Sequence, residues 1–193
     1  MENENREHRG NYCEKQWFAI RTRARHEKAV RHRLSHLGFE QLLPTLTRLS
    51  QWKDRKKLVQ EPLFPGYCFA KFLGLERITV LEVPGVAYIV GRREYPEPVP
   101  QEEIDTLTRL TTSGLQYEPC ASLNEGTLVE IIRGPLSGVK GRFIRREFHH
   151  YVTIGVQLIG LGATVRINVD DVVAIQIPVR TSGSRISLQL NRV

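Results

Sequence analysis

Residues 126–141 read GTLVEIIRGPLSGVKG, a pattern that joins a short strand to a glycine-rich turn. Val129 and Ile131 are two positions apart, so their side chains point to the same face of a strand. The Gly-Pro pair at 134–135 starts a tight turn, because proline presets φ and glycine tolerates positive φ. The later glycines let the chain fold back closely on the strand. The positions that define this motif are Gly126, Val129, Ile131, Gly134, Pro135, Gly138 and Gly141.

The sequence around this motif continues as short β-leaning runs separated by glycine-rich turns. This pattern predicts a small five-stranded β-barrel, in which closure removes most of the exposed sheet edges. Basic side chains crowd its loops and could present a cationic rim to RNA or to an acidic protein face. A glycine-rich hairpin without a particular role is the alternative. The five expected strands are residues 127–133, 142–146, 151–158, 163–169 and 172–175.

The first half of the chain has a different pattern, in which strands and helices are mixed. The apolar run Trp17–Thr22 predicts a largely buried strand. The segment His26–Leu37 predicts an amphipathic helix with Gly38 as its C-terminal cap. The apolar stripe of this helix consists of Val30, Leu34 and Leu37. Three further strands, expected to form an antiparallel sheet, are residues 41–49, 57–63 and 67–72.

Two more helices complete this half. A short helix is expected from residue 75 to 81 or 82, followed by a strand over Ala87–Val90. Pro100 suits the first turn of a third helix, which carries Ile104 and Leu107 on one side. The first half is therefore predicted to be an α+β sandwich, an antiparallel sheet flanked by helices.

These patterns divide the chain into two domains. The change from an α+β pattern to an all-β pattern marks the boundary, and the ten residues between the two patterns have no periodicity. Both ends of the chain are polar, with only weak alternation near the C-terminus. The predicted parts are a disordered tail over 1–14, a first domain over 15–112, a linker over 113–122, a barrel domain over 123–177 and a C-terminal tail over 178–193.

Composition narrows the possible partners and compartments. The chain has 28 Lys and Arg against 21 Asp and Glu, a net charge of +7, which favours polyanionic neighbours; a merely soluble basic protein is the alternative. The three cysteines are far apart and lack metal-ligand spacing, which fits a reducing compartment. Because no signal-like or membrane-spanning apolar segment is present, a cytoplasmic location without membrane contact is expected.

Enzymatic motifs are missing from the sequence. It contains no phosphate-binding glycine loop, no nucleophile elbow and no zinc-protease helix. His32 and His36 have helical spacing but no acidic or cysteine partner, so they are interpreted as exposed helix residues. Asp170 and Asp171 lie at a strand turn and are expected to close the barrel rather than to bind a metal. A non-catalytic protein without cofactor or metal is predicted.

The glycine-rich motif resembles the KOW motif, and the chain as a whole is similar to the NusG/RfaH family of transcription factors. Four segments in the family's order carry this resemblance across nearly the whole structured chain. They are residues 17–20 (WFAI), residues 61–69 (EPLFPGYCF), residues 83–86 (VPGV), and residues 157–160 (QLIG) continuing to Asp170, Asp171 and Val172.

The resemblance implies that the first domain docks on the clamp helices of the largest RNA polymerase subunit. Aromatic side chains on a rigid strand beside a Pro-Gly bend suit a helix-receiving anchor, because they bury a large area at a small entropic cost. Tyr67 and Phe69 share one face of their strand, although they could simply fill the core. The positions that match the family's docking residues are Phe64, Pro65, Tyr67, Phe69 and Ile89.

The resemblance also implies contacts to upstream DNA or to the non-template strand. Such contacts are mainly to phosphates and weaken as salt increases. The matching residues are Arg23 and Arg33, with Lys53, Arg55, Lys56 and Lys57 as an electrostatic fringe. A charged hairpin that only keeps the protein soluble is the alternative for this fringe.

The expected function is that of a monomeric elongation or antitermination factor. In the family, the KOW domain binds a ribosomal protein of the NusE type and, in general members, the termination factor Rho. A specialised paralog is favoured by the match at residues 61–69 and by the added C-terminal tail, whereas the barrel sequence resembles the general form. The alternative is an RNA- or ribosome-binding KOW protein that does not dock on polymerase.

Overall fold

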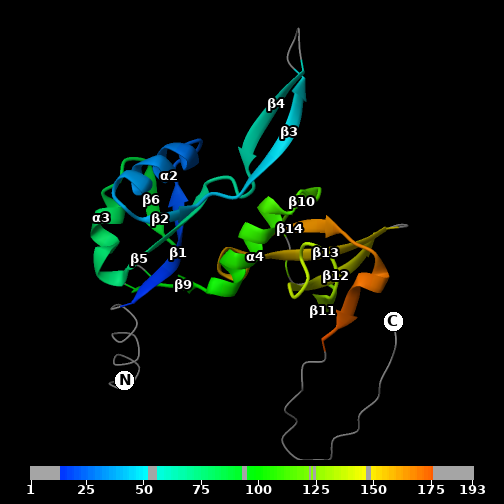
Figure 1. Ribbon diagram of the computed structural model, residues 1–193. Helices are drawn as coiled ribbons and strands as arrows, with labels where there is room; N and C mark the ends of the chain where they lie inside the picture. Colours follow the sequence, from blue (N-terminus) through cyan, green and yellow to red (C-terminus); the bar gives the residue numbers. More distant parts are fainter. Residues whose placement is uncertain are drawn as a thin grey trace, which may run out of the picture.

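The structure, a computed structural model, contains two principal antiparallel sheets, one from each half of the chain (Figure 1). Several residues, both chain ends included, lie outside the part that it describes. The disordered tail predicted for 1–14, apart from Glu14, and the C-terminal tail predicted for 178–193 are therefore not addressed by it. The described residues are 14–51, 56–92, 95–121, 123, 125–146 and 149–175.

The first sheet is built around β1 (Lys15–Thr22), the strand predicted from the apolar run. All four residues from Trp17 to Ile20 are buried, so both faces of this strand are covered. The strands follow the order β2-β5-β1-β6, and β9 also pairs with β1. The partners of β1 are β5 (Tyr67–Leu73), β6 (Val86–Ile89) and β9 (Pro98–Val99), and β2 (Glu40–Leu42) pairs with the outer side of β5.

One face of this sheet, here called the α2 face, packs against α2 (Glu27–His36) and α3 (Arg77–Leu81), which follows the 3-10 turn Gly74–Glu76. Val30 and Leu34 are buried as predicted. Leu37 is exposed, contrary to the predicted stripe, because α2 ends at His36 and the chain turns at Gly38, whose φ is +80°. The sheet contributes Phe18, Ile20, Cys68, Ala70 and Phe72 to this core.

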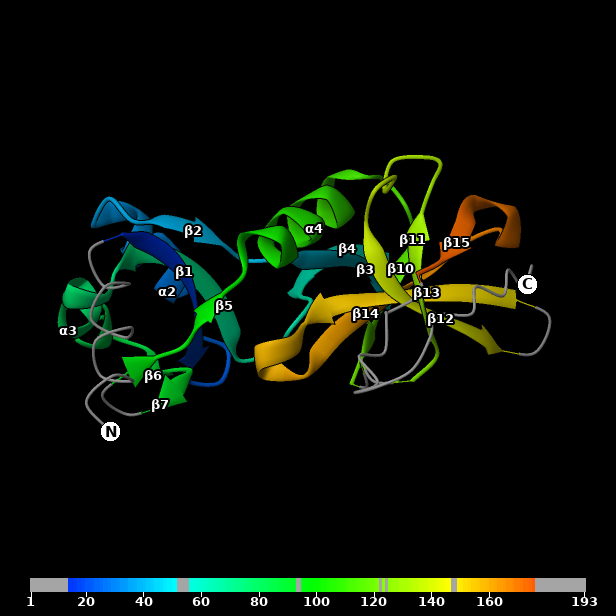
Figure 2. The ribbon, with the colours of Figure 1, turned by 90° about the horizontal axis from the view of Figure 1, so that it is seen from below.

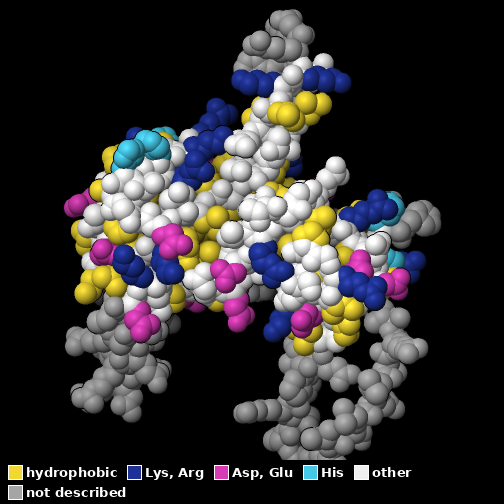
Figure 3. Space-filling view, viewed as in Figure 1, with side chains coloured by type: hydrophobic (Ala, Val, Ile, Leu, Met, Phe, Trp, Pro, Cys, Tyr) yellow, Lys and Arg dark blue, Asp and Glu magenta, His cyan; other side chains and the backbone are white. Residues whose placement is uncertain are grey.

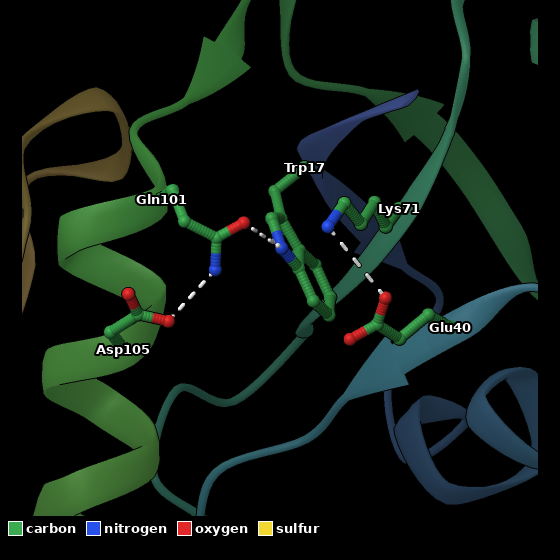
Figure 4. Close-up of polar contacts among 5 residues, drawn as sticks. All are labelled: Trp17, Glu40, Lys71, Gln101 and Asp105. Carbon is green, nitrogen blue, oxygen red and sulfur yellow. Dashed lines mark hydrogen bonds and ion pairs between the residues drawn. The ribbon is translucent and has the colours of Figure 1, made fainter. Parts of the chain in front are cut away.

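The opposite face, here called the docking face, packs against α4 (Gln101–Thr112). The indole Nε1 of Trp17 donates a hydrogen bond to Oε1 of Gln101 at 3.0 Å, which ties the start of α4 to β1 (Figure 4). Ile104 and Leu107 are buried, as the helical pattern predicted. Lys71 and Glu40 form an ion pair at 3.8 Å beside the indole (Figure 4).

Strands β3 (Thr45–Gln51) and β4 (Lys56–Pro62) form a separate hairpin, here called the arm, which protrudes from the molecule (Figure 1). The prediction of one strand over 41–49 in a single sheet is therefore wrong. The chain pairs with β5 only as far as Leu42, and Pro44 has no N–H to continue a ladder. A small hairpin of β7 (Gly91–Arg92) and β8 (Tyr95–Pro96) lies farther along the chain.

The second sheet has six strands in the order β10-β14-β13-β12-β11-β15. All five strands expected from the sequence are present. Gly141 occurs where the interior is tight, since a Cβ there would lie 2.5 Å from Cγ1 of Val152. In the described part of the chain, β10 and β15 do not pair with each other, so closure into a barrel remains a prediction. The strands are β10 (Tyr117–Cys120), β11 (Thr127–Ile131), β12 (Lys140–Arg146), β13 (His149–Val156), β14 (Leu161–Arg166) and β15 (Val172–Ala174), with 3-10 turns at Gln157–Ile159 and Val169–Asp171.

The sixth strand, β10, lies inside the segment 113–122 that the sequence predicted to be an irregular linker. It pairs antiparallel with β14, and Tyr117 is opposite Val165. The segment has no alternation of apolar residues and contains Pro119, which hides a strand from sequence patterns. A proline is tolerated here because β10 is an edge strand of the sheet.

The two sheets are in contact through α4 and the arm (Figure 2). α4 packs against β13, and the guanidinium of Arg109 donates hydrogen bonds to the carbonyl oxygens of Pro135, at 3.2 Å, and of Ser137. The hydroxyl of Tyr117 donates to the carbonyl oxygen of Thr45 at 2.6 Å. Buried side chains of both sheets form one continuous hydrophobic cluster. The division of the chain into two domains stays a prediction.

Candidate docking face and nucleic-acid interface

The turn between β4 and β5 and the first residues of β5 carry four of the five predicted docking residues. Phe64 is 2% exposed and Phe69 is 0% exposed, and their rings pack edge to face with centroids 6.2 Å apart. Pro65 is exposed and Tyr67 is half-buried. The turn thus has an accessible side, formed by Pro65 and Tyr67, and a side packed into the core.

Polar contacts hold this turn from several sides. The Arg21 guanidinium lies 4.6 Å from the centroid of the Tyr67 ring and donates to the Pro65 carbonyl oxygen at 3.4 Å. The backbone N–H of Gly66 donates to the buried Glu27 carboxylate at 2.6 Å, and the Gly66 carbonyl accepts from the Thr22 N–H at 2.8 Å. These contacts fix the orientation of the turn relative to β1 and α2.

Gly66 and Cys68 show how closely the turn is packed. The φ of Gly66 is +82°, which favours glycine, and a Cβ there would lie 2.7 Å from Nη1 of Arg21, so the end of the Arg21 side chain would have to shift. Burial, and secondarily the nearby Glu27 carboxylate, raises the pKa of the Cys68 thiol to about 12. The thiol is therefore protonated at neutral pH and acts as a packing group.

The strand register sorts the predicted residues by face. Tyr67 pairs with Arg21, which pairs with Tyr88 on its other side, so these three side chains form a row on the docking face. Phe69 pairs with Ala19 on that same face, which confirms that Tyr67 and Phe69 share a face. Ile89 pairs with Ile20 and packs into the α2 face instead, so the structure does not bring it together with the other four.

Arg21, Glu27 and Tyr88 were not singled out by the sequence analysis. Arg21 is part of the β1 pattern and carries no local signal of its role. Glu27 had no identified partner, because Gly66 is 39 residues away in the chain. Tyr88 lies on β6, and the face of the sheet to which its side chain points is set by the pairing of β6 with β1, whose register shifts between Arg21 and Thr22. Only the tertiary pairing shows that these residues surround one turn.

The docking face is covered. Phe64, Phe69 and Trp17 belong to a cluster that also contains buried residues of α4 and of the second sheet. The Gln157–Ile159 turn lies near the N-terminal part of α4, since Gln157 and Glu103 line the same cavity. Of the side chains that the family resemblance assigned to docking, Phe64 and Phe69 therefore serve as core on this face.

The predicted DNA-binding residues fall into two groups. Arg23 and Arg33 are exposed and converge on one turn: the Arg23 N–H donates to the Gly85 carbonyl at 2.8 Å, and the Arg33 guanidinium donates to the Pro84 carbonyl. Lys56 is exposed on the arm, as is the neighbouring Lys57. Lys53 and Arg55 lie outside the described residues.

Other basic side chains extend this surface beyond the prediction. Nζ of Lys28 on α2 donates to the carbonyl oxygen of Gln60 on β4 at 2.7 Å, which joins α2 to the arm. Arg48 is exposed on β3. Figure 3 shows Lys and Arg side chains from the region of α2 to the outer part of the arm. A cationic surface thus continues along one side of the molecule.

The glycine-rich motif forms the strand and turn that its pattern predicts. Val129 and Ile131 are buried on one side of β11. Gly134 and Gly138 have φ values of +82° and +83°, and Gly126 at +97° approaches the Phe143 carbonyl too closely for a Cβ. The carbonyls of this turn are the acceptors for Arg109.

Metal and membrane features are not found in the described residues. No group of three or more His, Cys, Asp or Glu side chains among them could hold a metal ion. No helix among them is long and apolar enough to cross a membrane.

Comparison with known proteins agrees with the segments that carry the resemblance. The family model described as "Transcription termination factor nusG" matches residues 15–108. The chain belongs to the NusG family. Transcription termination/antitermination protein NusG of Campylobacter jejuni is 27% identical over 133 residues, which cover 63% of this chain and 75% of that protein. The NusG protein of Streptococcus pyogenes serotype M1 is 27% identical over 149 residues, covering 69% and 82%.

A solved structure supports the fold. The structure described as "Domain interaction in Thermotoga maritima NusG" aligns with a TM-score of 0.52 at 22% identity, covering 86% of this chain and 99% of that one. The relatives are transcription termination and antitermination proteins. The family predicted from the four sequence segments is therefore confirmed.

Proposed function

We propose that this NusG-family protein is an elongation and antitermination factor that docks on the clamp helices of the largest RNA polymerase subunit through its docking face. The observation that carries this proposal is the turn Phe64–Tyr67, which is fixed by Arg21, Glu27 and Thr22 and presents Tyr67 and Pro65 to solvent. A fixed aromatic anchor beside an apolar surface loses little entropy when a helix packs on it.

Docking requires part of the present cover of this face to leave. Phe64 and Phe69 can contact a partner only if part of their cover moves away, because both are buried in the cluster that includes α4 and the second sheet, and we infer that the second sheet is the part that moves. The second sheet and the polymerase helices therefore compete for the same aromatic residues. Arg109, which holds the turn at Pro135 and Ser137, opposes this separation.

We further infer that the second half recruits a partner once it is released. By resemblance, that partner is a ribosomal protein of the NusE type or the termination factor Rho. Arg23, Arg33 and Lys56 would contact upstream or non-template DNA through phosphates. The protein would work as a cytoplasmic monomer and as a specialised paralog of the general factor.

A pull-down with purified core RNA polymerase tests the docking proposal on the full-length protein. Tyr67→Ala should weaken binding by roughly tenfold or more, since an interface aromatic commonly contributes above about 1–2 kcal/mol. Tyr151→Ala is the matched control, because Tyr151 is a half-buried tyrosine of the second sheet. Absence of polymerase binding by the wild-type protein, or equal binding by Tyr67→Ala and Tyr151→Ala, would contradict the proposal.

A further inference from the structure

The arm exposes an apolar pair far from the protein core. Leu49 and Leu58 are directly opposite each other in the β3–β4 ladder and are 61% and 67% exposed. Directly paired residues share a face, so the two side chains form one apolar patch. Figure 3 shows hydrophobic surface on the arm next to Lys and Arg side chains. Folding alone does not explain this patch, since it covers no core.

Cationic side chains surround this pair. One rung farther out on the same face, Lys56 pairs with Gln51, and both are exposed. The opposite face carries Arg48 and Lys57, which are exposed as well. Glu61 lies on that opposite face nearer the base, opposite Leu46. The outer part of the described arm is therefore apolar on one face and positively charged around it.

The base of the arm is held in place at several points. Lys28 bonds the Gln60 carbonyl from α2, and the Leu63 N–H donates to the Pro44 carbonyl at 2.8 Å. On the other side, Tyr117 donates to the Thr45 carbonyl. The leucine pair is thus presented at a defined position relative to the cationic surface of α2.

The combination of charge and apolar surface selects one class of partner. A paired duplex presents phosphates and groove edges, whereas the apolar faces of its bases are stacked and inaccessible. Unpaired bases expose these faces to side chains. Leucine is one of the apolar side chains that proteins insert where base steps become unstacked, and such insertion costs least where the bases are already unpaired. The cations around the pair match the phosphates of such a strand.

We propose that the arm binds single-stranded nucleic acid, with Leu49 and Leu58 packed against unpaired bases and Arg48, Lys56 and Lys57 on the phosphates. This inference rests on the DNA contact of the proposed function and adds a requirement for unpaired bases. In this proposal, Leu49 and Leu58 distinguish single-stranded from double-stranded nucleic acid, a role that the basic residues alone do not supply.

Fluorescence anisotropy with the full-length protein and a labelled oligonucleotide, single-stranded or annealed to its complement, tests this inference. The Leu49→Ser/Leu58→Ser variant should lose about tenfold in affinity for the single strand, keep its duplex affinity, and keep the same salt slope. Lys56→Ala/Lys57→Ala should weaken both forms and reduce the salt slope by about 1–2. Leu75→Ser is the matched control, since Leu75 is an exposed leucine in the 3-10 turn before α3 and away from the arm.

The possible results separate the inference from the function on which it rests. Equal single-strand affinity for wild type and Leu49→Ser/Leu58→Ser, with binding still dependent on salt, would overturn the role of the leucines and leave the DNA contact standing. Equal losses in Leu49→Ser/Leu58→Ser and Leu75→Ser would also overturn it. If the wild type binds neither form, the proposed DNA contact itself fails.

Discussion

The two faces of the first sheet differ in where their cover comes from. The α2 face is covered by α2 and α3, which are close in sequence to the strands that they cover. The docking face is covered by α4 and by a cluster that continues into the second sheet. Both faces contain completely buried aromatic residues, Phe72 on the first and Phe69 on the second.

Under the proposed function, this difference separates a permanent core from an exchangeable one. The apolar run of β1 requires both faces to be covered. The cover of the α2 face cannot leave without unfolding the first half. Part of the cover of the docking face belongs to another sheet, which is held by polar contacts such as those of Arg109. A partner helix could replace that part while the first half stays folded.

The largest expected effect is on the permanent core. Phe72→Ala should lower the free energy of unfolding by about 3–5 kcal/mol, because it removes a buried ring whose centroid lies 4.5 Å from that of the Phe18 ring. Urea denaturation monitored by circular dichroism measures the change. A loss below about 1 kcal/mol would show that the α2 face tolerates rearrangement, and the comparison between the faces would fail.

A smaller effect is expected at the turn. Gly66→Ala should destabilise the protein by about 1–3 kcal/mol, because alanine is strained at φ +82° and its Cβ would meet Arg21. Gly114→Ala is the control, since Gly114 also has a positive φ, +71°, but no neighbour within 4 Å of the added Cβ. The difference in urea midpoint between the variants isolates the contact with Arg21. Identical midpoints would show that Arg21 does not restrain the turn.

A substitution at the contact between the two halves should have a smaller effect than Gly66→Ala. Arg109→Ala should favour their separation by about 1 kcal/mol, since it removes two hydrogen bonds of an exposed guanidinium. Hydrogen exchange at the amides of β5 and β13 should become faster, while exchange within α2 stays unchanged. Faster exchange in α2 to the same degree would mean that the two faces are not independent.

The smallest effect concerns pH. Burial raises the pKa of Glu103, and the Gln157 N–H bond only partly offsets this. The pKa of Glu103 is higher in the folded than in the unfolded protein. The protonated carboxyl therefore contributes stability at pH values below its ordinary pKa, and that contribution is lost as the pH rises through the raised pKa. Glu103→Gln should remove this dependence, as measured by urea midpoints at acidic and neutral pH. The same pH dependence in wild type and variant would contradict the assignment.

Sequence patterns predicted the elements better than their pairing. The alternation in residues 127–131 and the helical spacing of Ile104 and Leu107 depend only on local periodicity, and both were correct. The arm was predicted to be part of the main sheet because the sequence does not show where pairing with β5 ends. That end, just before Pro44, depends on the tertiary arrangement of the strands. Strand β10 was missed because its partner β14 lies more than 40 residues later.

The candidate site shows the same limit. The resemblance identified Phe64, Pro65, Tyr67 and Phe69, which the structure gathers at one turn. It also identified Ile89, whose side chain faces the other side of the sheet because of its pairing with Ile20. The buried state of Phe69 matches the alternative that this residue fills the core, and its ring packs against that of Phe64.

The affinity of full-length protein for core RNA polymerase, compared among wild type, Arg109→Ala and Arg109→Ala/Tyr67→Ala, tests the central claim most directly. If the second sheet and the polymerase compete for the docking face, Arg109→Ala should bind about fivefold more tightly, the equivalent of about 1 kcal/mol. Adding Tyr67→Ala should abolish that gain and weaken binding below wild type. Unchanged or weaker binding by Arg109→Ala, or a double variant that binds as tightly as Arg109→Ala, would contradict the claim.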